Sequence, residues 1–299
     1  MTNDKLKRSA SFGDDLKALV KWGVLLANIL PVLTGFCLAL HFTNESFMGS
    51  LIPFILVVAG STFVMAGALV LNNWYDADID AIMKRTKKRP TVTGRFSLKA
   101  VFRFGIILSV IGFIMLLFTS LEASIYALIG WLTYVVFYTM WSKRKYTINT
   151  LIGSISGAVT PLIGWAAVDS AIHIVPLTLA LILFLFQVPH TFAIAMKKYE
   201  EYQAAEVAML PVVHGFQMTK RQIVIYVAAL LPLPFLLLSL GLVFVIVAEI
   251  LTIGWLLLAL YGFFAKDDLK WAHWNFLYSV NYMTILFLLA LLTPLWNAS

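Results

Sequence analysis

Three oxygen-bearing side chains recur at every fourth position in the segment Asn72–Arg95, NNWYDADIDAIMKRTKKRPTVTGR. They are Asn72, Asp76 and Asp80, and on a continuous helix this spacing places them on one face. Carboxylate and amide oxygens suit a hard cation such as Mg²⁺, which proteins commonly hold through one or two carboxylates together with substrate phosphate oxygens. The spacing therefore predicts a magnesium site that receives a diphosphate.

A basic cluster follows these residues directly: Lys84, Arg85, Lys87, Lys88 and Arg89. Arginine and lysine donors suit phosphate, which favours the same interpretation. The alternative is that the cluster only marks the cytoplasmic end of a membrane helix, where basic residues are enriched. That alternative accounts for the basic residues but not for regularly spaced acidic residues beside them. From spacing alone, both interpretations stay open.

The elements that must position these residues are membrane helices. The chain is 61% hydrophobic and 12% charged, and it carries several apolar runs of helix-spanning length. The run Leu51–Leu71 is about 30 Å long as a helix, so Asn72 lies where that helix meets water. We expect an all-α polytopic membrane protein with about nine transmembrane helices around a central cavity. The expected spans are Trp22–Phe42, Leu51–Leu71, Val101–Thr119, Ala123–Trp141, Ile148–Val168, Ile174–Met196, two spans within Ile223–Ala265 that turn near Ser239–Gly241, and His273–Pro294.

The distribution of basic residues sets the expected orientation. With these spans, all 22 lysines and arginines fall on one side of the membrane, which predicts a cytoplasmic N-terminus and an external C-terminus in the plasma membrane. The net charge of +7 then reports topology and does not indicate a nucleic-acid partner. We expect residues 1–20 to be a cytoplasmic tail, mobile over Met1–Asp15 and without a removable signal peptide. Residues 21–299 are expected to form one domain.

A second polar segment, Gln187–Gly215, begins within the last turns of the sixth expected span and continues beyond it. Its lysines, Lys197 and Lys198, are candidates for phosphate binding, and its acidic residues, Glu200, Glu201 and Glu206, could complement the first carboxylates. The glutamates lack the clean four-residue spacing of the first set. A solvated amphipathic helix is therefore the alternative interpretation of this segment.

Two polar residues, Gln187 and His190, fall inside the apolar sixth span. Polar residues within a membrane are costly and tend to be functional, so both are candidates for substrate contact. The alternative for His190 is a structural histidine beside the kink of Pro189. Tyr134, Tyr138 and Trp141 are expected to share one face of the fourth span, either as an interfacial belt and core packing or as aromatic faces that stabilise a carbocation.

With both polar segments considered, the chain resembles the UbiA-type intramembrane prenyltransferases. The segment Asn72–Arg95 resembles the first aspartate-rich motif of that superfamily. Further stretches resemble the protoheme IX farnesyltransferase (heme O synthase) branch: YTMWSKRKYTINTLIGSISGAVTPLIGWAA from Tyr138, QVPHTFAIA from Gln187 and KYEEYQAAEVAMLPVV from Lys198. The similarity extends from about Lys21 to the last expected helix.

This resemblance implies an active site at the cytoplasmic face and the transfer of a farnesyl group from farnesyl diphosphate to a vinyl group of heme b. It implies Mg²⁺ as cofactor, membrane lipid as surroundings, and heme A synthase or terminal oxidase assembly proteins as partners. The implied metal and catalytic positions are Asn72, Asp76 and Asp80, with Glu201 as a further metal position where the superfamily often has an aspartate. The implied diphosphate-binding residues are Arg85, Arg89, Lys143, Arg144, Lys197 and Lys198; the implied heme-binding residues are His190 and Gln187.

Two other functions remain open at the level of sequence. One is a prenyltransferase of the same type that acts on an aromatic quinone precursor. The other is a transporter or a heme-delivery protein without enzymatic activity. Transporters more often place charges or broken helices at mid-membrane depth, whereas the charge here is concentrated at one face.

Overall fold

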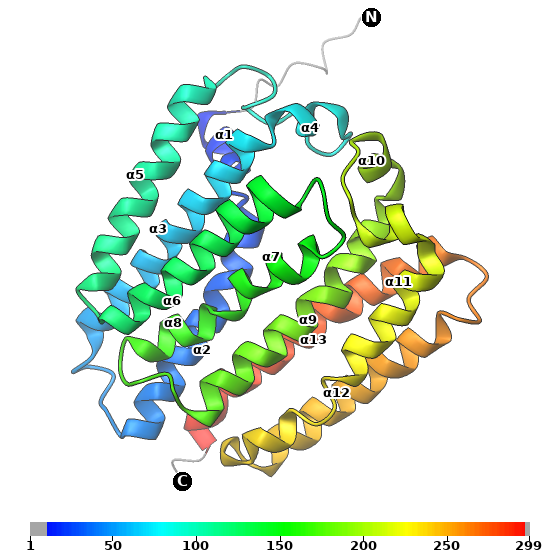
Figure 1. Cartoon of the computed structure of the whole chain (residues 1–299). Coiled ribbons are helices and arrows are strands. Elements are labelled where there is room, and N and C mark those ends of the chain that lie inside the picture. The colour runs from blue at the N-terminus through cyan, green and yellow to red at the C-terminus, as the bar shows by residue number, and fades with distance from the viewer. Residues whose placement is uncertain (1–10, 297–299) are drawn as a thin grey trace, which may run out of the picture.

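The computed structural model describes residues 11–296, and these form helices joined by short connections (Figure 1). Following a short α1 (Phe12–Leu19), the first half contains α2 (Trp22–Thr43), α3 (Leu51–Tyr75), α4 (Ala77–Ile82), α5 (Leu98–Leu117), α6 (Leu121–Leu132), the π-helix η1 (Thr133–Ser142), α7 (Asn149–Ala158) and α8 (Thr160–Ala166). The second half contains α9 (Ile174–Lys197), α10 (Tyr199–Ala204), α11 (Leu210–Ala228), the 3₁₀-helix η2 (Pro234–Leu240), α12 (Leu242–Tyr261) and α13 (Asp268–Trp296). The expected all-α fold is confirmed for these residues.

Seven segments within residues 11–296 are long and apolar enough to span a membrane: 22–43, 51–75, 98–117, 121–142, 174–197, 242–261 and 268–294. Each corresponds to one expected span. In place of the expected fifth span the chain forms two shorter helices, α7 and α8, which meet at Val159. The expected seventh span begins earlier, within α11, and ends in η2. The integral, multi-pass character is thus confirmed, while the total of nine spans stays a prediction.

The expected turn between the seventh and eighth spans is present. Gly241 separates η2 from α12 and has φ of 100°, a conformation that side chains with a Cβ rarely adopt. The prediction of a mobile N-terminal tail, in contrast, is wrong for the described part of that tail. Residues 12–19 form α1, in which Asp15 is buried and pairs with Arg95 at 2.8 Å. The remainder of that expectation, residues 1–10, lies outside the described residues.

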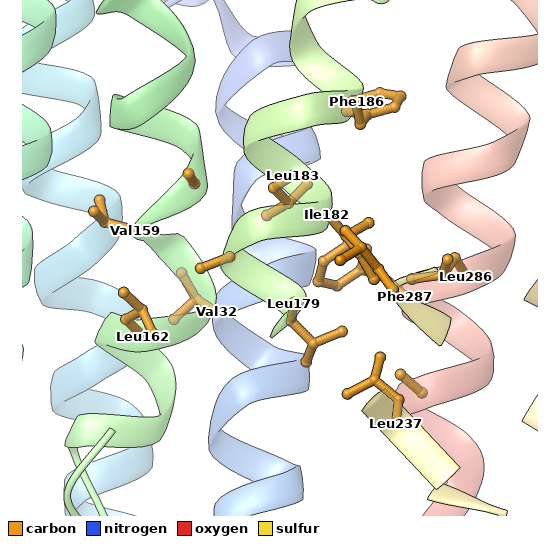
Figure 2. Packing of buried hydrophobic residues seen from close by; sticks show 14 of the residues in the cluster. Val32, Val159, Leu162, Leu179, Ile182, Leu183, Phe186, Leu237, Leu286 and Phe287 are labelled. Atoms are coloured by element: carbon orange, nitrogen blue, oxygen red, sulfur yellow. The ribbon is translucent and has the colours of Figure 1, made fainter. Parts of the chain in front are cut away.

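The core lies between α2, α8, α9 and α13, where apolar side chains such as Val32, Leu162, Ile182 and Phe287 interdigitate (Figure 2). Helices approach closely where glycines face a neighbouring backbone. A Cβ on Gly67 of α3 would lie 2.7 Å from the carbonyl oxygen of Gly105 on α5. Small residues at such crossings are typical of membrane helix packing, because apolar surroundings offer little hydrophobic driving force and close contact must supply the attraction.

The short polar helices gather at one end of the bundle. α1, α4 and α10 lie together at the top of Figure 1, whereas α13 ends at the opposite end. The ends of α3, η1 and α9 therefore deliver their polar residues to the same face of the molecule. This arrangement brings the two polar segments of the sequence together.

Candidate active site

Asp76 lies at a break between α3 and α4, so the three spaced residues do not share one uninterrupted helix as the sequence analysis assumed. Asp76 has φ of −87° and ψ of 6°, outside the usual helical range. The hydrogen-bond pattern nevertheless continues through the break. The amide of Asp76 donates to the carbonyl of Asn72 at 2.9 Å, and that of Asp80 to the carbonyl of Asp76 at 2.8 Å. The four-residue spacing therefore still groups the three side chains.

These side chains are buried at the end of a membrane helix. Asn72, Asp76 and Asp80 are only 1%, 1% and 3% exposed. The amide nitrogen Nδ2 of Asn72 donates to Asp76 Oδ2 and to Thr139 Oγ1 of η1, both at 2.9 Å. Buried carboxylates require charged or hydrogen-bonding partners, because burial without them is strongly unfavourable.

Basic residues from other elements supply those partners. Lys143 forms an ion pair with Asp76, and Arg89 with Asp80. Arg144 donates two hydrogen bonds to Asp78, at 2.6 and 2.7 Å, and its guanidinium also lies 3.7 Å from Asp76 Oδ1. These hydrogen bonds from Arg144 are the largest cause of the lowered pKa of Asp78. Three of the predicted diphosphate-binding residues are thus placed around the carboxylates.

Lys21 is a site residue that the sequence analysis missed. It precedes α2, and its ammonium group donates to Asn72 Oδ1 from a partly buried position. Burial lowers the pKa of Lys21 well below its usual range, and the charges of Arg89 and Lys143 lower it further. Its backbone is left-handed, with φ of 49°, which is uncommon for a residue other than glycine. The only sequence signal was a lysine immediately before an apolar span.

Strain of this kind persists where surrounding contacts impose it, and it clusters at functional sites. Here the left-handed turn at Lys21 lies between α1 and α2. The neighbouring contact of Asn73, whose amide donates to the carbonyl of Leu19 at 2.6 Å, fixes the same corner. Together these contacts direct the Lys21 side chain toward the carboxylates.

The donor set fits a hard divalent cation. Asp76 Oδ1 is buried and accepts no hydrogen bond from a described residue, so it retains lone pairs for a ligand. Over residues 11–296, no three His, Cys, Asp or Glu side chains converge in a metal-binding arrangement. Mg²⁺ needs only one or two carboxylates when phosphate oxygens and water complete its octahedron. Asp76 and Asp80, with the amide of Asn72 beside them, match that requirement.

Glu201, the fourth predicted metal position, lies apart from these residues in the described contacts. It accepts hydrogen bonds from the backbone amide of Arg85 at 3.2 Å and from the ammonium of Lys198 at 3.1 Å. Burial opposes ionisation, but these hydrogen bonds outweigh it and lower the pKa of Glu201. Glu201 thereby joins α10 to the loop after α4. The neighbouring Tyr202 packs, partly buried, against Ile79 of α4 and Met83 of the loop, and burial raises its pKa.

An apolar cavity lies in the same half of the chain as the carboxylates, and Leu69, which lines it, precedes Asn72 on α3 by three residues. It is lined by α2, α3, α6, η1 and α8, with Met65, Trp131, Tyr134 and Ile163 among its walls. Tyr134 lies within electrostatic range of Asp76, Asp80 and Arg89, and it stacks on Tyr138 with ring centroids 5.6 Å apart. The cavity therefore has an aromatic wall, Tyr134, close to the carboxylates.

Trp141 does not share this face, so that part of the sequence analysis is wrong. The π-helix η1 has more residues per turn than an α-helix, which rotates later residues away from the face predicted by a spacing of 3.6. Trp141 is 48% exposed and contacts Tyr146, with ring centroids 5.5 Å apart. Irregular turns of this type are frequent at functional sites.

The side chain of His190, one of the two polar residues within α9, faces α13. His190 Nδ1 is 2.7 Å from Ser279 Oγ, and the Ser279 hydroxyl donates to the carbonyl of Phe276 at 2.7 Å. Because that hydroxyl has one proton, we assign the His190 proton to Nδ1, which leaves Nε2 as an acceptor. Gln187, one helical turn before His190, makes no hydrogen bond with it among the described residues. The amide of Gln187 packs instead against Gly157 of α7, where a Cβ would overlap it.

Lys197 and Lys198 are also placed away from the carboxylates. The ammonium of Lys197 lies 4.2 Å from the centre of the Phe276 ring, and Lys198 pairs with Glu201. Neither makes an ion pair with Asp76 or Asp80 in the part of the chain that the structure describes. The predicted phosphate-binding residues thus fall into two groups, one around the carboxylates and one at the end of α9.

Comparison with known families identifies the class of protein. The model of the UbiA prenyltransferase family matches residues 28–280, which is most of the chain. The chain therefore belongs to the UbiA prenyltransferase family. Its similar curated relatives include a protoheme IX farnesyltransferase of Oceanobacillus iheyensis, 51% identical over 285 residues that cover 95% of this chain and 91% of the relative. A protoheme IX farnesyltransferase of Geobacillus sp. strain WCH70 is 54% identical over 286 residues, 96% and 93% of the two chains.

Solved structures share the fold at low sequence identity. A digeranylgeranylglyceryl phosphate synthase superposes with a TM-score of 0.73 at 21% identity, covering 94% of this chain and 98% of the other. A UbiA homologue from Archaeoglobus fulgidus, bound to GPP and Mg²⁺, superposes with a TM-score of 0.66 at 16% identity, covering 92% and 99%. These comparisons confirm the family resemblance drawn from the motifs and the UbiA-type helical fold.

Proposed function

We propose that this protein transfers the farnesyl group of farnesyl diphosphate to a vinyl group of heme b, forming heme O and releasing diphosphate. The observation that carries the proposal is the carboxylate pair Asp76 and Asp80, surrounded by basic groups, near an apolar cavity that Leu69 and Tyr134 help to line. A prenyl diphosphate has this same division into a charged head and an apolar chain. The protoheme IX farnesyltransferase relatives support heme as the acceptor.

Asp76, Asp80 and Asn72 would hold Mg²⁺ on the diphosphate, and the metal when bound supplies charge neutralisation that improves the leaving group. Substrate binding releases Lys143, Arg89 and Arg144 from their carboxylate partners, because the diphosphate oxygens compete for the same donors. These donors, together with Lys21 and Arg85, then stabilise the negative charge that develops on the departing oxygens.

The carbon–oxygen bond of the allylic diphosphate breaks, and its electron pair leaves with the diphosphate. The vinyl group supplies the electron pair of the new carbon–carbon bond, and water adds to the resulting cation with loss of a proton. Stacked Tyr134 and Tyr138 present aromatic faces near the charged head, where they stabilise positive charge on the farnesyl group. The apolar cavity limits early capture of the farnesyl cation by water.

We also propose that His190 contacts the heme. Its Nε2 has no hydrogen-bond partner among the described residues, and a neutral imidazole nitrogen with an oriented partner is a common iron ligand. Ser279 is that orienting partner. Gln187, one helical turn earlier, would contact the heme from the side of α7.

The orientation follows from charge. We propose that the face with α1, α4 and α10 is cytoplasmic, in a plasma-membrane protein whose C-terminus is external, because the 22 basic residues lie on one side of the expected spans. Residues 21–299 would form the prenyltransferase domain behind a cytoplasmic tail. Heme O would pass from this protein to a heme A synthase or to a factor that assembles terminal oxidases.

The deciding experiment incubates purified protein with Mg²⁺, farnesyl diphosphate and heme b, and measures released diphosphate and the mass of the product. Farnesylated, hydrated heme confirms the proposal. Prenylation of an aromatic quinone precursor in place of heme would establish the alternative acceptor. Tight heme binding without diphosphate release under any condition would favour a delivery or transport protein.

A further inference from the structure

A cavity of about 760 Å³ lies beside the end of α9, bordered by α10, α11 and the start of α13. Its volume falls within the range of small-molecule sites, roughly 300–1,000 Å³. Polar walls are formed by Lys84, Lys197, Lys198, Glu200 and Glu201, and apolar walls by residues such as Phe216 and Leu269. This cavity shares no lining residue with the apolar cavity that Tyr134 lines.

Lys197 supplies a positive charge that no carboxylate neutralises. Lys198 is paired with Glu201 at 3.1 Å, whereas Lys197 makes no ion pair with a carboxylate in residues 11–296. Its ammonium lies over the Phe276 ring, 4.2 Å from the ring centre. This cation–π contact positions the ammonium and leaves it able to bind an anion. Lys84 is likewise exposed and unpaired among the described residues. The cavity therefore offers ammonium groups to an anionic ligand.

The same ring of Phe276 links Lys197 to His190. The His190 and Phe276 rings lie 5.3 Å apart, and Phe186 stacks on His190 from one turn earlier at 5.4 Å. His190 and Lys197 are seven residues apart on α9, which places them on one face about 10 Å apart along the helix axis. The Phe276 ring thus contacts both the His190 ring and the unpaired ammonium of Lys197.

The carboxylate groups of a porphyrin match this arrangement. In heme b the two propionates lie on one side of the macrocycle rim, and the vinyl groups lie on the remaining sides. A porphyrin centred near His190 directs its propionates to Lys197 and its vinyl edge away from them. The basic groups around Asp76 and Asp80 are already committed to carboxylates of the protein and to the diphosphate.

We propose that Lys197, assisted by Lys84 and Lys198, forms a carboxylate subsite for the porphyrin acceptor, distinct from the diphosphate site. This inference rests on the proposed function, because it specifies how that acceptor is oriented. Lys197 acts in substrate specificity: it selects a porphyrin that carries free carboxylates and positions its vinyl edge for attack. The subsite assigns Lys197 and Lys198 to the acceptor in place of the diphosphate.

The test compares heme b with its dimethyl ester, which has the same macrocycle but no carboxylate charge. Binding of each to the purified full-length protein is measured by absorption titration, and farnesyl diphosphate binding is measured in parallel. Lys197→Met removes the charge and keeps much of the side-chain volume. Lys197→Arg keeps the charge, and Lys99→Met removes an exposed lysine of α5 as a matched control.

Wild type, Lys197→Arg and Lys99→Met are expected to prefer the free acid over the ester by about tenfold, equivalent to about 1.4 kcal/mol. Lys197→Met should lose that preference while its affinities for the ester and for farnesyl diphosphate remain those of wild type. An unchanged preference in Lys197→Met, or a loss confined to farnesyl diphosphate affinity, overturns the subsite. Equal binding of acid and ester by wild type also overturns it.

These outcomes are separable from the proposed function. If Lys197→Met loses the preference for the free acid over the ester, but the wild-type protein releases no diphosphate, the subsite is supported and the transferase function is refuted. Production of heme O by a protein whose Lys197→Met variant discriminates like wild type would support the transferase and refute the subsite.

Discussion

Replacing Lys21 with methionine should change the affinity of the carboxylate site for its two ligands, farnesyl diphosphate and Mg²⁺, in opposite directions. The substitution removes the ammonium that donates to Asn72 Oδ1 and keeps an unbranched apolar side chain of similar length. Lys21 reaches Asp76 through one intervening amide, since Asn72 Nδ2 donates to Asp76 Oδ2 at 2.9 Å. Removal of the charge therefore makes the site more negative by one unit.

The size of the effect follows from Coulomb's law. Across about 5 Å, with an effective dielectric constant of about 20, two unit charges interact by about 3 kcal/mol. Partial exposure and rearrangement reduce this value, so we expect a change of about 10- to 100-fold in affinity. Farnesyl diphosphate should bind that much more weakly to Lys21→Met. Mg²⁺ alone should bind more tightly, because a repelling cation has been removed.

Protein stability should change much less than ligand affinity. The lost hydrogen bond to Asn72 contributes about 1.5–3 kcal/mol as a charge-assisted contact. Repulsion from Arg89 and Lys143, and the cost of burying an ammonium, are lost at the same time and offset much of that contribution. We expect the free energy of unfolding to stay within about 1 kcal/mol of wild type.

The assay is isothermal titration of farnesyl diphosphate and of Mg²⁺ into wild type, Lys21→Met and Lys17→Met. Lys17 is an exposed lysine of the preceding helix, α1, so Lys17→Met serves as the matched control. Titrations at rising pH add a second test. Because the folded pKa of Lys21 is lowered, its charge and the diphosphate affinity should be lost as pH rises through that lowered pKa. Lys21→Arg, which stays charged, should lack this dependence. Equal changes in both ligands, or none, would refute the reasoning.

Three further results are expected. Asp76→Asn should reduce turnover by orders of magnitude in a folded protein, and excess chelator should abolish wild-type activity until Mg²⁺ is restored. Normal turnover of Asp76→Asn, or of wild type in excess chelator, would contradict the metal hypothesis. His190→Ala should weaken heme binding and alter the heme absorption spectrum while farnesyl diphosphate affinity stays unchanged, whereas a structural role would lower both affinities and the thermal stability together. A tag after Ser299 should be protected from protease in inverted vesicles and one before Met1 should be cleaved; the reverse pattern contradicts the proposed orientation.

The sequence alone determined the class of fold and the first carboxylate motif. Membrane spans depend on the local density of apolar residues, so hydropathy located the seven long helices to within a few residues. The four-residue spacing of Asn72, Asp76 and Asp80 is also a local property. It grouped the three side chains even though α3 ends between them.

The tertiary structure decided which residues join that motif. Lys21 reaches Asn72 across 51 positions of sequence, and His190 meets Ser279 across 89. No periodicity within one helix specifies contacts between helices so far apart in the chain. The same reason explains why adjacent Lys197 and Lys198 have different partners, Phe276 and Glu201. Hydropathy and spacing report what one helix does by itself, whereas the site consists of side chains that only packing brings together.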